Sequence, residues 1–88
     1  MAPMTDEEIL AALRAERGRL TPVELAERLD QLISGKLSQG YIVMFFKRAF
    51  PEIPLRVLLE AGAWARVCGG EGESDAEFNE RLRPWLGP

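Results

Sequence analysis

A helix-start signal occurs three times along the chain and constrains its fold more than any other feature. Thr5, Thr21 and Ser74 are each followed three residues later by a glutamate. In such a capping box the hydroxyl accepts a hydrogen bond from the glutamate's amide, and the carboxylate accepts one from the amide of the cap residue. Pro22, directly after Thr21, suits the first position of a helix. The pattern predicts an all-α protein.

Apolar side chains at helical spacing predict where the helices run. Residues 41–46 form a continuous apolar run that would also suit a buried strand. We favour a helix, because no second strand-like run exists with which a strand could pair. The prediction is therefore a compact antiparallel bundle of five or six short helices in one domain, residues 1–88. Five of them cover residues 6–17, 21–34, 38–50, 54–67 and 75–83.

Three further expectations concern the second half of the chain. The predicted fourth helix has two adjoining apolar rows, which begin at Leu55 and Val57, so it is expected to be largely buried. Pro84 is expected to limit the fifth helix. The glycine-rich, acidic residues 69–73 are expected to form a flexible loop.

The residue types argue against catalysis and metal binding. The chain has no histidine, so it lacks the usual base that activates a serine or cysteine nucleophile. Three hydroxyls are already assigned to helix caps. The alternating acids from Glu71 onward lack the glycine and the terminal glutamate of a calcium loop. We expect no enzyme activity, no metal and no cofactor.

Cysteine content and hydropathy indicate the cellular compartment of the protein. Cys68 is the single cysteine and cannot form an intramolecular disulfide, which is typical of a reducing compartment. The longest apolar run, residues 41–46, is far shorter than the ~20 residues that span a bilayer. We expect a cytoplasmic protein with no membrane partner.

Charge is distributed unevenly along the chain. The net charge is -3, yet residues 36–66 carry five bases and two acids, a net +3, and the segments on either side carry -3 each. A helix-turn-helix DNA-binding regulator is therefore an alternative, with Ser38 and Gln39 at the start of the recognition helix. That helix has few polar side chains to read base edges, and the acidic flanks would repel a duplex. Nucleic acid is disfavoured as a partner.

Large apolar side chains are too numerous for all of them to fit inside a bundle of this size. Aromatic residues and arginine are the usual anchors of protein interfaces, so a protein-interaction module is the leading hypothesis. Core packing is the alternative role of each aromatic side chain. The candidate anchors are Tyr41, Met44, Trp85, Arg48 and Arg56.

The layout of short, capped helices around the apolar segment 41–59, with charged surfaces of both signs, resembles the death-like superfamily of helical adaptor domains. The CARD-like modules of bacterial antiphage systems are the closest comparison. The resemblance covers roughly residues 5–85. It implies a non-enzymatic adaptor, in bacterial defence signalling, that recruits or oligomerises effectors such as proteases.

The resemblance also implies assembly between charge-complementary faces. The acidic set is Glu24, Glu27 and Asp30; the basic set, on the next copy, is Lys47, Arg48 and Arg56. The protein partner would be a second copy, a homologous helical domain or an effector to which the chain is fused. An acidic immunity or antitoxin-like protein that binds one toxin is a further alternative.

Overall fold

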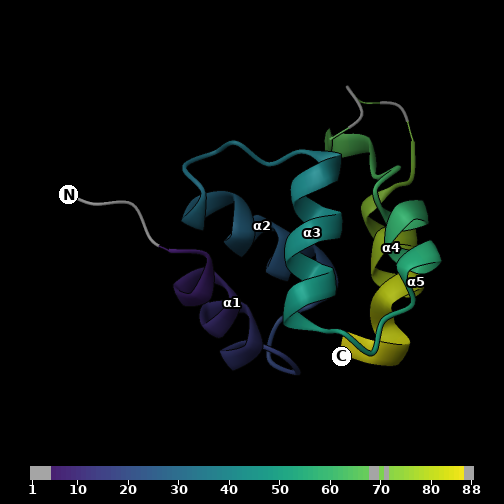
Figure 1. Cartoon of the computed structure of the whole chain (residues 1–88). Coiled ribbons are helices and arrows are strands. Elements are labelled where there is room, and N and C mark those ends of the chain that lie inside the picture. The colour runs from purple at the N-terminus through teal and green to yellow at the C-terminus, as the bar shows by residue number, and fades with distance from the viewer. Residues whose placement is uncertain (1–4, 68–69, 71, 87–88) are drawn as a thin grey trace.

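The computed structural model describes residues 5–67, 70 and 72–86. Within them the chain forms five α-helices and one short 3₁₀ helix (Figure 1). The elements are α1 (Asp6–Ala15), α2 (Pro22–Leu32), α3 (Gln39–Ala49), α4 (Leu55–Ala61), the 3₁₀ helix η1 (Ala65–Val67) and α5 (Asp75–Leu86). The prediction of an all-α bundle is confirmed. A sixth α-helix is not present in the part of the chain that the structure describes.

Side-chain caps begin four of the five α-helices. In the three predicted capping boxes, the hydroxyl oxygen lies 3.2–3.3 Å from the amide nitrogen of the glutamate. The glutamate carboxylate accepts the amide of the cap residue in each box. At the start of α3, Ser38 Oγ accepts a hydrogen bond from the amide of Tyr41 at 3.3 Å. These bonds satisfy amides that a helix leaves unpaired at its N-terminus.

α3 lies between α1 and α4 and packs against both, while α2 packs against α1 and α5 (Figure 1). α3 and α4 run antiparallel. Gln39, at the start of α3, lies so close to Gly62, just past α4, that a Cβ there would come within 2.6 Å of Gln39 Cγ. Near the end of α3, Lys47 Nζ donates to the carbonyl oxygen of Ile53, before α4, at 2.7 Å.

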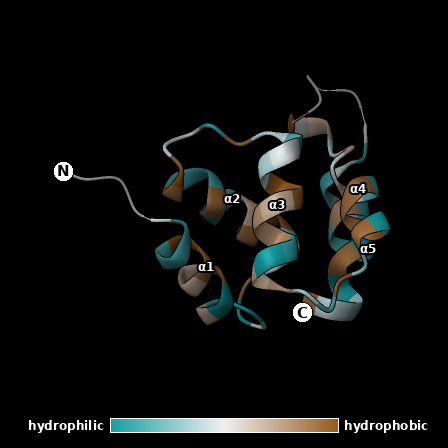
Figure 2. Ribbon diagram, in the orientation of Figure 1, coloured by the Kyte–Doolittle hydropathy of each residue, from teal (hydrophilic) through white to brown (hydrophobic). Residues whose placement is uncertain are grey.

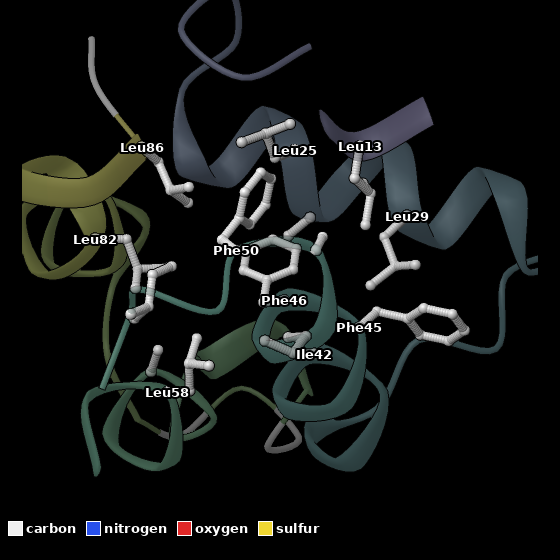
Figure 3. Close-up of a cluster of buried hydrophobic side chains, with 14 of the residues drawn as sticks. Leu13, Leu25, Leu29, Ile42, Phe45, Phe46, Phe50, Leu58, Leu82 and Leu86 are labelled. Atoms are coloured by element: carbon white, nitrogen blue, oxygen red, sulfur yellow. The ribbon is translucent and has the colours of Figure 1, made fainter. Parts of the chain in front are cut away.

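One hydrophobic core holds the helices together, and the buried side of α3 contributes its centre (Figure 3). Phe46 packs edge to face against Phe50, which follows α3, with ring centroids 5.8 Å apart. The α3 positions predicted by helical spacing are all buried: Ile42, Phe45, Phe46 and Ala49. Leucines from the other α-helices surround them: Leu13, Leu25, Leu29, Leu58, Leu82 and Leu86.

The fourth helix is shorter and more exposed than predicted. It ends at Ala61, not at residue 67, and only Leu58 and Ala61 are buried. Leu55 and Leu59 are 50% and 53% exposed. A surface helix buries only the side that faces the core. The prediction of a largely buried fourth helix is therefore wrong, since only two of its residues are buried.

The contacts of Trp64 explain why α4 ends early. Its ring is fully buried and stacks on Phe78 of α5, with centroids 4.4 Å apart. Its indole Nε1 donates to Asp75 Oδ1 at 2.8 Å. The amide of Glu73 also donates to the Ala63 carbonyl oxygen at 2.9 Å. A continuous helix over residues 54–67 could not bring these groups to the start of α5.

The last helix is longer than predicted. It continues through Pro84 to Leu86, whereas the expected end is residue 83. Proline removes one amide donor, but Arg17 donates to the carbonyl oxygen of Trp85 at 2.8 Å and Leu86 is buried, so the final turn is held in place. The predicted flexible loop includes residues 69 and 71, which lie outside the described residues, as does Cys68.

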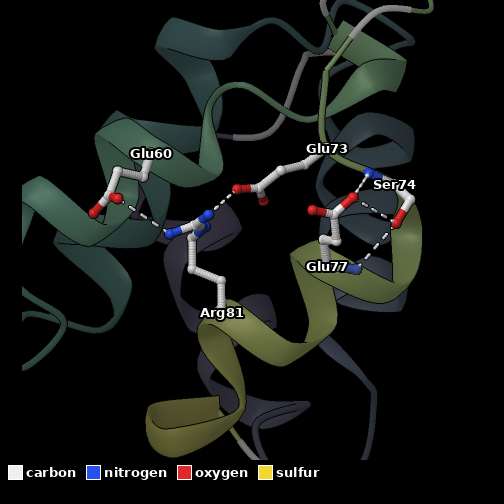
Figure 4. A network of polar contacts seen from close by, with 5 residues as sticks. All are labelled: Glu60, Glu73, Ser74, Glu77 and Arg81. Atoms are coloured by element: carbon white, nitrogen blue, oxygen red, sulfur yellow. Dashed lines mark hydrogen bonds and ion pairs between the residues drawn. The ribbon is translucent and has the colours of Figure 1, made fainter.

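Arg81 of α5 links α4 to the segment that follows it (Figure 4). Its guanidinium pairs with Glu60 of α4 at 3.2 Å and with Glu73, whose side chain is 11% exposed. The hydrogen bond to Glu73 raises the pKa of Arg81 above its ordinary value, although burial acts in the opposite direction. Glu73 Oε1 is buried without a hydrogen-bond partner. The Glu73 carboxylate therefore depends on Arg81 to balance its charge.

We predict that Phe46→Ala lowers the free energy of unfolding by about 3–5 kcal/mol, because it leaves a cavity at the centre of the core. The milder Ile42→Val should cost about 0.5–1.5 kcal/mol. Met44→Ala, on the exposed side of the same helix, should cost less than about 1 kcal/mol. Urea unfolding measures all three. Equal losses for Phe46→Ala and Met44→Ala would contradict the assignment of the two sides of α3.

We also predict that Arg81→Met destabilises the fold by about 1–3 kcal/mol, because it leaves the Glu73 carboxylate without a partner. Glu60→Gln should cost less than about 1 kcal/mol, since Glu60 is exposed. The double variant Glu73→Gln/Arg81→Met should recover part of the loss, because neither charge is then left unpaired. A double variant less stable than Arg81→Met would argue against this coupling.

Candidate interaction surface

Large hydrophobic side chains that are exposed occur, among the described residues, on α3 and α4 alone. Tyr41 and Met44 of α3 are 39% and 40% exposed, and Leu55 and Leu59 of α4 are more exposed still. A single exposed apolar residue is ordinary, but four on two helices that pack together need an explanation. We call these four side chains the α3–α4 face.

Helical geometry brings the two halves of the face together. On α4, Leu55, Leu59 and Gly62 form one row with spacing i, i+4, i+7, and Gly62 lies against α3. On α3, Met44 belongs to the same row as Lys47, whose ammonium reaches the connection to α4. Both rows therefore border the seam between the helices, on its exposed side, whereas Tyr41 lies where α3 meets α1 and the α2–α3 connection. In Figure 2, hydrophobic ribbon is visible on both α3 and α4.

Tyr41 separates two shallow hollows. The first has a volume of about 210 Å³ and is lined by Ser38, Gly40, Tyr41 and Met44. The second, of about 240 Å³, lies where α1 and the α2–α3 connection meet α3, and its lining includes Ile9, Ile33 and Phe45 as well as Tyr41. The Tyr41 ring stacks on Phe45, with centroids 6.0 Å apart. The ring is thus a ridge with room for a side chain on either side.

The three basic residues predicted to bind a partner have different surroundings. Lys47 donates to two backbone carbonyls of the α3–α4 connection, at 2.7 and 3.0 Å. Arg48 pairs with Asp6 and Glu7 of α1, at 3.3 and 3.5 Å. The Arg56 side chain makes no ion pair or hydrogen bond with any residue that the structure describes. Arg48 is therefore a structural contact between α1 and α3, whereas Arg56 is available to a partner.

The three predicted acids and Trp85 lie away from the α3–α4 face. Glu24 is part of the capping box of α2, and Asp30 accepts a hydrogen bond from the amide of Leu37 at 3.0 Å. Glu27 is exposed on α2. None of the three lines either hollow beside Tyr41. Trp85 is half-buried and packs against the core.

Sequence reasoning missed Leu55 and Leu59 as surface residues. It placed them on a helix of four turns with apolar side chains on most sides, and such a helix would be buried. A signal was nevertheless present, because Leu55 and Leu59 form an i, i+4 row distinct from the row of Leu58 and Ala61. In a helix of only seven residues, one of these rows must face solvent.

The exposed side of α3 also bears on the DNA-binding alternative. Gln39, expected to reach base edges, instead packs against Gly62. Two of the exposed side chains of α3, Tyr41 and Met44, are apolar, and the exposed Arg48 is paired with acids of α1. The α2–α3 connection spans residues 33–38, longer than the three or four residues usual in a helix-turn-helix. These features favour contact with protein over contact with a DNA groove.

Comparison with known proteins identifies no relative: no family model matches the chain, and no curated protein or solved structure matches it significantly. None of the helices in the described ranges is long and apolar enough to cross a membrane. Those ranges also contain no group of three or more side chains that could hold a metal ion. The function is therefore inferred from the chemistry of the surface itself.

The different surroundings of the two arginines lead to a prediction. Arg48→Glu should lower the free energy of unfolding by about 1 kcal/mol, because it replaces two ion pairs with repulsion from Asp6 and Glu7. Arg56→Glu should change it by less than about 0.5 kcal/mol. Chemical denaturation at low salt measures both. A larger loss for Arg56→Glu than for Arg48→Glu would show that the ion pairs with α1 do not stabilise the fold.

Proposed function

We propose that this chain is a non-enzymatic protein-interaction module, an adaptor whose docking surface is the α3–α4 face. The observation that carries the proposal is the exposure of four large apolar side chains, Tyr41 and Met44 on α3 and Leu55 and Leu59 on α4, two helices that pack against each other. Tyrosine and methionine are enriched at protein interfaces. The hollows on either side of Tyr41 can each accept a side chain of the partner.

The hydrophobic effect gives this face a useful but limited binding free energy. Fully burying one large apolar side chain contributes about 1.5–3 kcal/mol. Because the four side chains are only 39–53% exposed, burying what remains of them supplies roughly 3–6 kcal/mol, near the lower end of the cost of association, which is about 4–15 kcal/mol. A partner must therefore fit the hollows closely and add polar contacts at their edge. Such a surface suits regulated recruitment better than permanent assembly.

The setting that we propose is bacterial defence signalling, in the cytoplasm, with an effector as the recruited partner. Support comes from the resemblance of the sequence to death-like adaptor domains, whose all-α fold class this chain shares. The single cysteine is compatible with a reducing compartment.

The proposal can be tested by photo-crosslinking in the cells that make the protein. A benzophenone amino acid is placed at Met44 or, in a second variant, at Leu59. We expect each to give a discrete covalent adduct with a partner protein, because both side chains lie on the docking surface. The matched control carries the same amino acid at Gln31, which is exposed on α2 and should give no such adduct. Absence of adducts from Met44 and Leu59, or the same adducts from Gln31, would refute the proposed docking surface.

A further inference from the structure

We infer that the occupant of the α3–α4 face is an acidic amphipathic helix from a different protein, and not a second copy of this chain. The inference rests on the proposed function and adds the chemistry of the partner to it. Three observations carry it: the charge at the edge of the face, the composition of the other surfaces, and the antiparallel arrangement of α3 and α4.

The charge that is left unbalanced near the face is positive. The two acids of residues 36–66 are both engaged elsewhere, Glu52 with Arg17 and Glu60 with Arg81. Lys47 contacts only backbone carbonyls among the described groups. The side chains of Lys36 and Arg56 make no ion pair or hydrogen bond there. Lys36 and Asp6 both line the second hollow beside Tyr41, but Asp6 is paired with Arg48 whereas Lys36 is not paired with any described residue. A partner with carboxylates at its edge would therefore meet complementary charge.

A symmetric dimer through this face would bring like charges together. In an interface with two-fold symmetry, the same patch of both copies is in contact. Lys47, which borders the seam, and Arg56, which follows Leu55 in α4, would then approach their own counterparts or each other. No acid near the seam is free to separate them, because Glu52 and Glu60 are already paired. Such a dimer gains hydrophobic contact but loses electrostatic free energy.

A head-to-tail contact with a second copy fits no better. Every exposed large hydrophobic side chain within the described ranges belongs to the α3–α4 face. Any other described surface of a second copy, including the acidic side of α2, would thus place polar groups against Tyr41, Met44, Leu55 and Leu59. Polar groups that lose water without gaining a hydrogen bond oppose binding. The apolar side chains that this face needs must come from another molecule.

The shape of the face indicates a helix as the binding element. α3 and α4 are antiparallel neighbours, and the seam between two such helices accepts a third helix by packing of ridges into grooves. The two hollows flank the Tyr41 ring. A partner helix in the seam would place one apolar side chain in the hollow beside Met44 and others, at i+3 or i+4, against Leu55 or Leu59, as in other helix-in-groove complexes. Acidic side chains on the same helix would then reach Lys36 and Arg56.

The experiment immobilises the full chain and selects peptides that bind it from a phage-displayed random library. The peptides have about 16 residues, which is long enough for four helical turns. Enriched sequences are resynthesised, and their affinities are measured by fluorescence anisotropy. We expect them to carry net negative charge and apolar residues three or four apart. Met44→Asp should weaken their binding at least about tenfold, since it places a charge in the apolar contact. Raising the salt concentration from about 50 to about 500 mM should weaken it about three- to tenfold.

A pair of charge variants tests the electrostatic part separately. Arg56→Glu should weaken binding of the acidic peptides about threefold or more, because it reverses a charge beside the face. The matched control is Arg19→Glu, in the turn between α1 and α2, which makes the same change at an exposed side chain without a partner among the described residues. The control should leave binding unchanged. Equal effects of the two variants would overturn the charge argument.

The remaining outcomes separate this inference from the proposed function. Peptides that need Met44 but are neutral or basic would overturn the acidic partner and leave the docking surface intact. Failure to enrich any peptide that depends on Met44 would count against both. The last measurement is the oligomeric state of the chain alone, by sedimentation equilibrium. A monomer supports a heterologous partner. A dimer that Met44→Asp abolishes would show that a second copy is the occupant.

Discussion

Phe46 and Phe50 meet edge to face in the interior, where the end of α3 approaches α1, and neither ring is accessible to solvent. Two arginines of the N-terminal part hold this region from outside. Arg14 donates to the carbonyl oxygens of the last residues of α3, and the Arg17 guanidinium lies 5.6 Å from the centre of the Phe50 ring. The position of α3 is therefore fixed both by packing and by satisfied helix-end carbonyls.

Because one side of α3 is committed to the core, its other side must face outward. That side carries Tyr41 and Met44, side chains whose exposure folding alone does not explain. α4 repeats the arrangement on a smaller scale, with Leu58 inside and Leu55 and Leu59 outside. The same two helices thus supply both the centre of the core and the proposed docking surface. A partner would bind helices that are already formed and packed against the core, so association would require little ordering of the backbone.

Ion pairs within the chain determine which charges are left for a partner. Arg48 joins α1 to α3, and Arg81 joins α5 to Glu60 and to the nearly buried Glu73. Both bases thus join separate helices of the fold. Arg56 has no such role among the described contacts, and it follows Leu55 in the chain. The net charge of a segment could not distinguish bases that are paired within the chain from bases that are not, because it counts every base equally.

Sequence alone determined the local structure: the capping boxes at Thr5, Thr21 and Ser74 set three helix starts, and helical spacing identified the buried side of α3. These features depend on residues within one or two turns of each other. Tertiary structure decided the rest. Trp64 stacks on Phe78 and so ends α4 early, in a short helix that leaves Leu55 and Leu59 exposed. Burial of Leu86 and the hydrogen bond from Arg17 stabilise the last turn of α5 beyond Pro84. Such contacts join residues far apart in the chain, so no local pattern contains them.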